Sequence, residues 1–297
     1  MEIRYLKSLI AVVDSGSIAE AARNEHLTAA AIGQRVQVLE RELGFALLSR
    51  SGHSAQPTRA CTLLLPRARR LVREAALLQG DASVDGLRGT LRIGAVSTVL
   101  TGLLPRALRA FSQAAPEAKA QIIPGTSREL FRLLQAGEID AALIVEPPFA
   151  LPRTMRAVHL RKEPLVLLAP PGADASRPAA LLCELPYIRY DPNAWGGRHA
   201  AAWLADQGIA PAVLCDLDAL EAIAMLVADG MGVSLVPQWM GIERFAGECL
   251  SIPMPGAAYA RQMVMVSAVD ADCAQMVSVL EAALVGDRGL APGASPR

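Results

Sequence analysis

The hydrophobic and polar positions of residues 15–50 follow the pattern of two short helices joined by a tight turn. Ser17 followed by Glu20 is a capping box, which predicts that a helix begins directly after Ser17. A break at residues 25–27 ends this helix, and Thr28 can cap the next one. On periodicity alone the pair could be an ordinary helical hairpin as well as a helix-turn-helix.

The second helix has one apolar face and ends at a glycine. Its apolar residues recur at spacings of four, three and four, so they share one buried side: Ile32, Val36, Leu39 and Leu43. Gly44 supplies the C-terminal stop. Residues 45–53 and 56–58 then predict a short strand, a glycine turn and a returning strand. This pair has the form of a β-wing carrying Arg50 and His53, and it favours the helix-turn-helix.

Residues 62 to about 83 predict one long helix. Its apolar positions alternate spacings of four and three and form a heptad seam: Leu64, Ala68, Leu71, Ala75, Leu78 and Ala82. Such a seam either packs on the helix's own domain or joins two subunits. Pro66 lies inside the pattern and is expected to loosen the helix near Thr62, because proline has no N–H.

Beyond the Gly- and Asp-rich residues 81–90, short apolar strands alternate with amphipathic helices, which predicts two α/β units with parallel sheets. The first has strands at 91–96, 120–123 and 141–145 and helices at 103–114 and 127–136. The second has strands at 165–169, 187–190, 213–215 and 232–236 and helices at 198–207 and 219–229. A strand at 263–269 returns toward the first unit, and a helix at 273–285 closes it.

Residues 6–61 resemble the winged helix-turn-helix of LysR-type transcriptional regulators. The matching residues are Ser15-Gly16-Ser17, Ala21-Ala22, Leu39-Glu40, Leu43-Gly44, Leu47-Leu48-Ser49-Arg50 and Thr58. The later part of the chain resembles the periplasmic-binding-protein-like effector domain of the same family, with crossings between two lobes at 161–168 and 263–269 and a glycine-rich turn and strand at 230–237. The resemblance implies an α/β fold with an N-terminal winged helix-turn-helix, a long linker helix and a two-lobed effector domain.

This resemblance divides the chain into four parts. We expect a DNA-binding domain at 1–61, a linker and dimerisation helix at 62–86, an effector-binding domain at 87–290 and a flexible tail at 287–297. Lobe I would comprise residues 91–161 and 268–286, and lobe II residues 162–267. The function implied is regulation of transcription by a homodimer or homotetramer on promoter DNA, modulated by a small-molecule effector between the lobes.

Composition and charge are compatible with this. The chain has 297 residues, 52% hydrophobic and 4% aromatic, and no apolar run reaches the roughly 18 residues of a membrane helix. The N-terminus lacks the basic-then-apolar layout of a signal peptide, so a cytoplasmic protein is expected. The net charge is zero, but residues 1–90 hold 12 Arg and Lys against nine Asp and Glu. Any phosphate contact is therefore expected in this first segment.

The resemblance implies DNA contacts from the second helix and the wing. The family usually has Ser-Gln at the start of this helix and a serine near its middle, where this chain has alanines and a glycine, so thin direct readout and more shape readout are expected. Gln34 is placed to pair with adenine, and Arg35 or Arg41 could reach guanine or phosphate. The candidate DNA-binding residues are Thr28, Ala29, Ala30, Gly33, Gln34, Arg35, Gln37, Arg50, His53 and Thr58.

Strand ends in the α/β units suggest a ligand pocket, because ligands bind beyond the carboxyl ends of strands, near helix N-termini. Ser97-Thr98 and Thr126-Ser127 either cap helices or hold an anionic group, typically a carboxylate; the resemblance implies effector contact at Ser97, Thr98 and Thr126. Glu146 is either a solvated rim residue or selects an amine or hydroxyl. Asp218 precedes a helix at capping-box spacing. The candidate effector-binding residues are Ser97, Thr98, Thr126, Ser127, Glu146, Arg189, Trp195 and Asp218.

Signatures of enzymes are missing from the sequence, which has no nucleophile elbow, P-loop, dinucleotide fingerprint or zinc-protease motif. The five cysteines are dispersed without metal-binding spacing, so no catalytic residue, metal or cofactor is predicted. Two alternatives remain open. One is a small-ligand-binding or catalytic α/β protein with a helical N-terminal cap and no role on DNA, and the other is a redox sensor like the peroxide-responsive members of the family.

Overall fold

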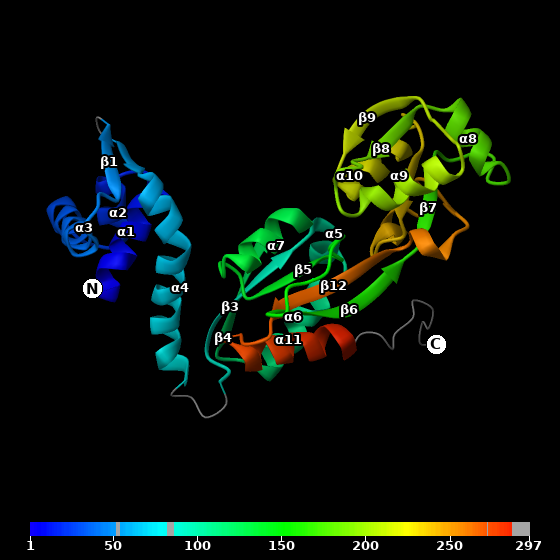
Figure 1. The fold of residues 1–297 in the computed structure, drawn as a ribbon. Coiled ribbons are helices and arrows are strands. Elements are labelled where there is room, and N and C mark those ends of the chain that lie inside the picture. The colour runs from blue at the N-terminus through cyan, green and yellow to red at the C-terminus, as the bar shows by residue number, and fades with distance from the viewer. Residues whose placement is uncertain (52–53, 82–85, 272, 287–297) are drawn as a thin grey trace. The chain divides into compact units, whose positions relative to one another are not determined.

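The computed structural model describes residues 1–51, 54–81, 86–271 and 273–286, which form two compact units (Figure 1). The first unit consists mainly of residues 1–89, and the second of residues 90–134 and 139 onward. His53 of the wing, Ala82 of the heptad seam and the tail expected at residues 287–297 lie outside the described residues. No described helix is long and apolar enough to cross a membrane.

The first unit contains three helices, a two-stranded wing and a long helix. Its elements are α1 Ile3–Ser15, α2 Ile18–Asn24, α3 Ala29–Leu43, β1 Leu48–Ser51, β2 Ser54–Pro57 and α4 Arg59–Asp81. The predicted caps are confirmed: Ser17 Oγ accepts the Glu20 N–H at 3.4 Å, and Thr28 Oγ1 accepts the Ala31 N–H at 3.2 Å. Gly44 ends α3 with a φ of +80°, a left-handed conformation that favours glycine.

The apolar face of α3 packs on α1 and α2, as its periodicity predicts. Ile32, Val36 and Leu39 are buried, and the small residues Ala21 and Ala22 of α2 allow the helices to approach closely. The antiparallel wing pairs Leu48 with Pro57 and Ser51 with Ser54. These contacts define a winged helix-turn-helix whose core involves only elements of the first unit.

The long helix α4 differs in two ways from its prediction. It begins at Arg59, three residues before Thr62, because Thr58 Oγ1 accepts the Cys61 N–H at 3.1 Å and caps it; it also continues through Pro66. Three of the described seam residues, Leu64, Ala68 and Leu71, belong to the hydrophobic cluster of α1 and α3. This part of the seam therefore packs on its own domain, as the simpler of the two alternatives predicts.

The second unit has two lobes. Lobe I is built on a five-stranded sheet of order β4-β3-β5-β12-β6. Its elements are β3 Gly89–Ala95, α5 Ser97–Thr101, α6 Leu104–Ala114, β4 Ala118–Pro124, α7 Ser127–Gln135, β5 Ala141–Val145, β6 Met155–Glu163, β12 Arg261–Ala268 and α11 Ala274–Gly286. Strand β5 is buried on both faces, which explains its unbroken apolar sequence.

Lobe II contains a sheet of order β10-β7-β11 and the pair β8-β9, joined by a parallel bridge between Tyr187 and Val233. Its elements are β7 Leu165–Ala169, α8 Pro178–Glu184, β8 Tyr187–Tyr190, α9 Gly197–Asp206, β9 Val213–Leu217, α10 Leu220–Ala228, β10 Ser234–Pro237, η1 Ile242–Phe245, β11 Leu250–Pro253 and η2 Ala257–Tyr259. Alternate residues of β7 pack into different clusters, so Leu167 and Leu168 face opposite sides of the sheet.

The prediction of parallel sheets is only partly correct. Strands β3 and β5 are parallel, as are β8 and β9, but β12 runs antiparallel to both β5 and β6. In lobe II, β10 and β11 run antiparallel to β7. The physical reason is that β6 leaves lobe I and β12 returns to it, so these two strands pair as neighbours of opposite direction. The sequence interpretation also missed β6, β11, α1, α5 and α8.

Replacement of Gly33 should stabilise the first unit. Gly33 lies inside α3, and a Cβ at this position would meet no atom within 4 Å. We expect Gly33→Ala to raise the free energy of unfolding by about 1 kcal/mol, because alanine is the better helix former. Denaturant unfolding followed by circular dichroism measures this.

Gly197 provides the contrast, because a Cβ there would collide with the carbonyl group of Asp191. Gly197→Ala is expected to lower the free energy of unfolding. If Gly33→Ala lowered the free energy of unfolding as much as Gly197→Ala does, the space around Gly33 on the outer face of α3 could not be open as described.

Candidate functional site

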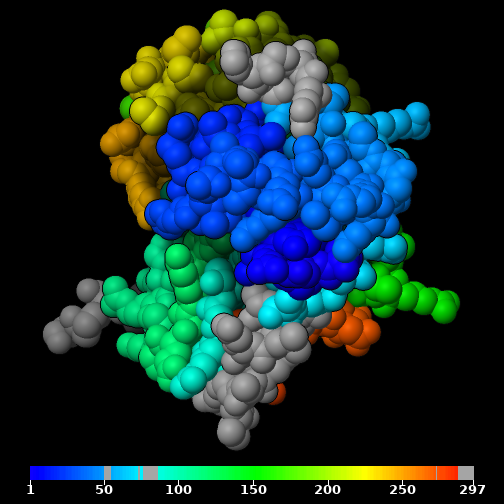
Figure 2. All heavy atoms as spheres, turned by 90° about the vertical axis from the view of Figure 1, so that its left-hand side faces the viewer, coloured from blue at the N-terminus to red at the C-terminus, as the bar shows by residue number. Residues whose placement is uncertain are grey.

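The outer face of α3 is a solvent-exposed surface of small and amide side chains. Figure 2 turns the side of the first unit that carries α3 toward the viewer. Thr28, Ala29, Ala30, Gln34 and Gln37 are exposed there, on the side opposite the buried apolar face. Because Gly33 adds no side chain between them, the glutamines are the longest groups on this stretch of the helix. They offer hydrogen-bond donors and acceptors without charge.

Arg35 does not belong to this face, although the sequence interpretation placed it among the DNA contacts. Its Nη1 donates to Ser8 Oγ at 3.0 Å and lies 3.5 Å from Glu25 Oε2. Ser8 is buried and donates to the same Glu25 oxygen at 2.7 Å. Arg35 therefore ties α1, α2 and α3 together. The helical pattern of α3 does not reveal these contacts, because both partners are distant in sequence.

The structure describes the three candidate DNA-binding residues of the wing region to different extents. Thr58, a candidate DNA-binding residue, donates its hydroxyl to the Ala46 carbonyl at 2.9 Å, and its oxygen accepts the Cys61 N–H and so caps α4, so both functions of the hydroxyl serve the fold. Arg50 lies on β1, which places it in the wing. The structure describes neither its side chain nor His53.

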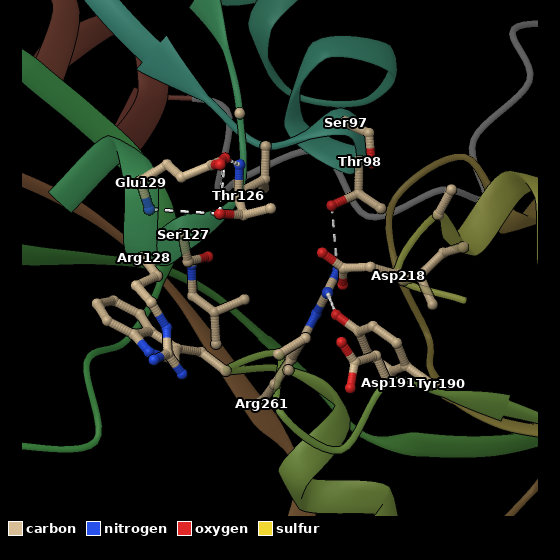
Figure 3. Close-up of a pocket in the computed structure, with 18 of the residues that line it drawn as sticks. Ser97, Thr98, Thr126, Ser127, Arg128, Glu129, Tyr190, Asp191, Asp218 and Arg261 are labelled. Atoms are coloured by element: carbon tan, nitrogen blue, oxygen red, sulfur yellow. Dashed lines mark hydrogen bonds between the residues drawn. The ribbon is translucent and has the colours of Figure 1, made fainter. Parts of the chain in front are cut away.

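A cavity of about 760 Å³ lies between the two lobes of the second unit. Six of the eight predicted effector-binding residues line it: Ser97, Thr98, Thr126, Ser127, Trp195 and Asp218. Figure 3 shows Thr98, Thr126 and Ser127 from lobe I and Asp191, Tyr190 and Asp218 from lobe II around the same space. The ends of β3, β4 and β5 thus meet the ends of β8 and β9, as expected for a ligand site in α/β sheets.

Glu146 and Arg189 are not part of the cavity wall, contrary to their prediction. Glu146 Oε1 lies 4.0 Å from His159 Nε2, whereas its neighbour Val145 lines the cavity. Arg189 donates to both carboxylate oxygens of Asp216, its partner on β9, at 2.5 and 2.8 Å. Side chains alternate between the two faces of a strand, so the residue beside each of them faces the cavity instead.

Arg261 is the main cavity residue that the sequence interpretation missed. It is only 2% exposed and donates from Nε to Glu163 Oε2 at 2.5 Å. Its remaining N–H groups point to Thr98 Oγ1 at 3.1 Å and to the Tyr190 hydroxyl at 3.4 Å (Figure 3). Arg261 therefore joins lobe I, lobe II and the strand on which it lies.

The pKa values of this cluster reflect both burial and charge. Burial lowers the pKa of Arg261, but the negative charge of Glu163 and the hydrogen bonds to Glu163 and Tyr190 outweigh it, so this pKa is raised. Burial raises the pKa of Tyr190 to about 12, so its hydroxyl is a neutral partner at pH 7. Burial, Arg198 and Arg261 lower the pKa of His199 to about 4. Burial is thus the main cause of the pKa shifts of Tyr190 and His199, and the Arg261 guanidinium is a smaller one.

The start of α7 at the cavity is already capped by its own side chains, whereas α5 has no side-chain cap. Thr126 Oγ1 accepts the Glu129 N–H at 3.3 Å, and Glu129 Oε2 accepts the Thr126 N–H at 3.0 Å and its hydroxyl at 2.9 Å. Ser127 Oγ accepts the Val145 N–H at 3.1 Å. Asp218 is different, because α10 begins at Leu220 with Ala219 as its uncapped N-cap residue. Asp218 therefore does not cap α10, and among the described residues its carboxylate has no hydrogen-bond partner.

Aromatic side chains from both lobes meet at one edge of the cavity. The Trp195 ring lies 5.8 Å from the Phe131 ring and 5.6 Å from the Phe149 ring, in tilted and edge-to-face arrangements. Trp195 is almost completely buried by these contacts. An aromatic cluster of this kind contributes apolar area and directional ring contacts that hold the lobes together at this edge.

Metal and thiol chemistry find no support at either site. Among the described residues, no group of His, Cys, Asp or Glu could hold a metal ion. All five cysteines are free thiols, and Cys61, Cys249 and Cys273 are buried. Burial raises the pKa of Cys61 and Cys249, which disfavours the reactive thiolate. The redox-sensor alternative therefore gains nothing from the structure.

Together these features define a class: a winged helix-turn-helix module joined to a two-lobed ligand-binding α/β module. Sequence comparison identifies the family. Residues 3–62 match the model of the bacterial regulatory helix-turn-helix proteins of the lysR family, and residues 85–283 match the LysR substrate binding domain. The chain belongs to the LysR family and is a DNA-binding transcriptional regulator with an effector-binding domain, not an enzyme. The alternative without a role on DNA is thereby removed.

Individual relatives agree in length and fold. The chain is 30% identical to the HTH-type transcriptional regulator ClcR of Pseudomonas putida, over 86% of this chain and 91% of the relative. A full-length variant of OxyR from Pseudomonas aeruginosa superposes with a TM-score of 0.70 at 20% identity, covering 96% of this chain and 94% of that one. CbnR in complex with its target DNA superposes with a TM-score of 0.65 at 23% identity, covering 95% of this chain and 100% of that one. The two solved structures establish the shared fold.

Breaking the Arg261–Glu163 pair should destabilise the second unit strongly. Both side chains are almost completely buried, so Glu163→Gln leaves the guanidinium charge without its counterion. We expect a loss of about 3 kcal/mol in the free energy of unfolding, measured by denaturant titration of the full chain.

Glu184→Gln is the matched control. Glu184 lies 3.0 Å from Arg177, but both side chains are 60% exposed. Its replacement should change the free energy of unfolding by less than about 0.5 kcal/mol. Equal effects of the two substitutions would contradict the importance assigned to the buried pair.

Proposed function

We propose that this regulator reads duplex DNA with the outer face of α3 and responds to a small molecule held between lobes I and II. The exposed face of α3 carries the first half of the proposal. Its opposite side is fully used in packing, so Gln34 and Gln37 are available to base edges in a major groove. The side chains on this face are small at Ala29 and Ala30 and absent at Gly33, so bases can approach the helix closely.

The packing of α3 gives no reason for the glycine at position 33, because a Cβ there would meet nothing within 4 Å. A glycine inside a helix costs stability, and close approach of an external surface is a physical reason to keep it. The outer face offers few groups that distinguish bases. We therefore assign much of the sequence preference to DNA shape and half-site spacing.

The first unit also supplies the positioning contacts. Thr28 is exposed at the N-terminus of α3, where the helix dipole favours a phosphate, and Arg50 of the wing adds positive charge. Thr58 and Arg35 are removed from this group because their side chains serve the fold. These contacts fix the protein on the duplex without reading sequence.

Assembly and location complete the proposal. DNA-reading modules of this type act in symmetric pairs on two half-sites, and we propose that the chain forms a homodimer or homotetramer through α4. On this helix Leu63 is 75% exposed, on the side away from the cluster that packs against α1. A bacterial transcriptional regulator must reach chromosomal DNA, which lies in the cytoplasm, so we propose a cytoplasmic location.

The experiment begins by letting the chain select duplexes from a random-sequence pool, and affinities are then measured on the selected duplex. We expect Gln34→Ala to lose about 1–3 kcal/mol of discrimination at one base pair while leaving the salt dependence unchanged, because glutamine carries no charge. Systematic base-pair substitution in the selected duplex measures this.

Gln113→Ala is the control, since Gln113 is an exposed glutamine on α6 of the second unit. It should leave affinity and preference unchanged. If the chain enriches no duplex, the proposed function is wrong. If Gln34→Ala weakens every duplex equally, the reading role of Gln34 is wrong.

A further inference from the structure

We propose that the effector carries a positively charged nitrogen, held in the cleft by the carboxylates of Asp191 and Asp218. This inference rests on the proposed function, because it takes the cavity between the lobes as the effector site. A positively charged effector takes the place of the carboxylate that the hydroxyl groups of Ser97, Thr98, Thr126 and Ser127 suggested.

The positive end of α7 is already neutralised from within the chain. Glu129 accepts both the N–H and the hydroxyl of Thr126, which are the groups that a ligand carboxylate would use. A carboxylate placed there would instead meet the negative charge of Glu129 at close range. Hydrogen bonds to Thr126 also lower the pKa of Glu129, so it is ionised at neutral pH. This corner of the cavity repels anions.

The charges around the cavity add up to an excess of negative charge. Three acidic side chains line it, against two arginines: Glu129, Asp191 and Asp218, and Arg128 and Arg261. Arg261 is already paired with Glu163 behind the wall. Arg128 is exposed and donates to the Asn193 carbonyl at 3.2 Å. An incoming cation therefore meets a favourable potential, and an incoming anion an unfavourable one.

Two aspartates of lobe II, Asp191 and Asp218, line this wall and repel each other electrostatically. Asp191 Oδ1 accepts the backbone and side-chain N–H groups of Asn193 at 2.9 and 3.0 Å, which fixes the carboxylate in place. Asp218 makes no hydrogen bond or ion pair with any residue that the structure describes. In Figure 3 both carboxylates lie on the lobe II side, opposite Thr126 and Glu129.

The protonation equilibrium of Asp218 agrees with this geometry. Partial burial raises its pKa, and the negative charges of Asp191 and Glu129 raise it further, while Arg261 acts in the opposite direction. An ammonium group between Asp191 and Asp218 would relieve this repulsion and gain charge-assisted hydrogen bonds.

The rest of the cavity accommodates an apolar body. Its volume of about 760 Å³ lies within the range of small-molecule sites. Apolar side chains line it beside the aspartates: Val96, Leu100, Val145, Trp195 and Leu220. The ligand class that fits is an amine or an amino compound with an aliphatic or aromatic skeleton.

Calorimetric titration of the full chain with matched probes tests the charge preference. The probes are 2-phenylethylamine against 3-phenylpropionate, and butylamine against pentanoate, with 2-phenylethanol as the neutral member. We expect each amine to bind at least about tenfold more tightly than its carboxylate. Asp218→Asn should weaken amine binding about ten- to a hundredfold and leave 2-phenylethanol unaffected.

Asp216→Asn is the matched control, because Asp216 pairs with Arg189 and is not part of the cavity wall. It should leave amine affinity unchanged. Asp191→Asn provides a second variant if Asp218→Asn fails to fold, and it should show the same loss of amine affinity. The melting temperature without ligand checks the fold of each variant.

Three results would overturn the proposal: carboxylates that bind as tightly as amines, amines that do not bind, or amine affinity that survives replacement of the aspartates. The wild-type chain is tested in parallel on its selected duplex. Loss of amine preference with intact DNA selection overturns the ligand class alone, whereas failure to select DNA overturns the proposed function.

Discussion

The buried ion pair of Arg261 and Glu163 is the interaction on which the effector-binding unit depends. It joins the first residue of β12 to the last residue of β6, the two strands by which the chain passes between the lobes. Neither charge has access to water, so each requires a charged partner; Glu163 also lies 3.8 Å from Arg161, whereas Arg261 has Glu163 as its ion-pair partner among the described residues. The same guanidinium reaches Thr98 in lobe I and Tyr190 in lobe II. The geometry of the crossing is therefore tied to both walls of the cavity.

Further contacts connect the lobes around this pair. The Thr101 hydroxyl donates to Glu221 at 3.0 Å, and Arg244 donates to the Thr101 carbonyl at 2.8 Å. Arg128 reaches across to Asn193, and the Trp195 ring packs on Phe131. A ligand in the cavity changes the balance of lobe arrangements only if it binds one of them better than another. These bridging contacts are the ones whose strength would differ between such arrangements.

The sequence predicted local features well and long-range partners poorly. The caps at Ser17 and Thr28 depend on neighbours three residues away, so the pattern shows them directly. From the helical pattern, Arg35 is predicted to be a surface residue of α3, but its partners Ser8 and Glu25 lie on α1 and at the end of α2. The role of Arg261 depends on Glu163 and Thr98, which are 98 and 163 positions away from it in the sequence, respectively. Only the folded arrangement of the crossing strands could identify it.

The central claim is that occupation of the cleft and binding of DNA are coupled in one chain. The direct measurement is the affinity of the full chain for its selected duplex, without ligand and with a small molecule that saturates the cleft. We predict that the affinity for DNA changes about five- to 150-fold and that the affinity for the small molecule changes by the same factor when DNA is bound. An affinity for DNA that is identical with the cleft empty and saturated would contradict it.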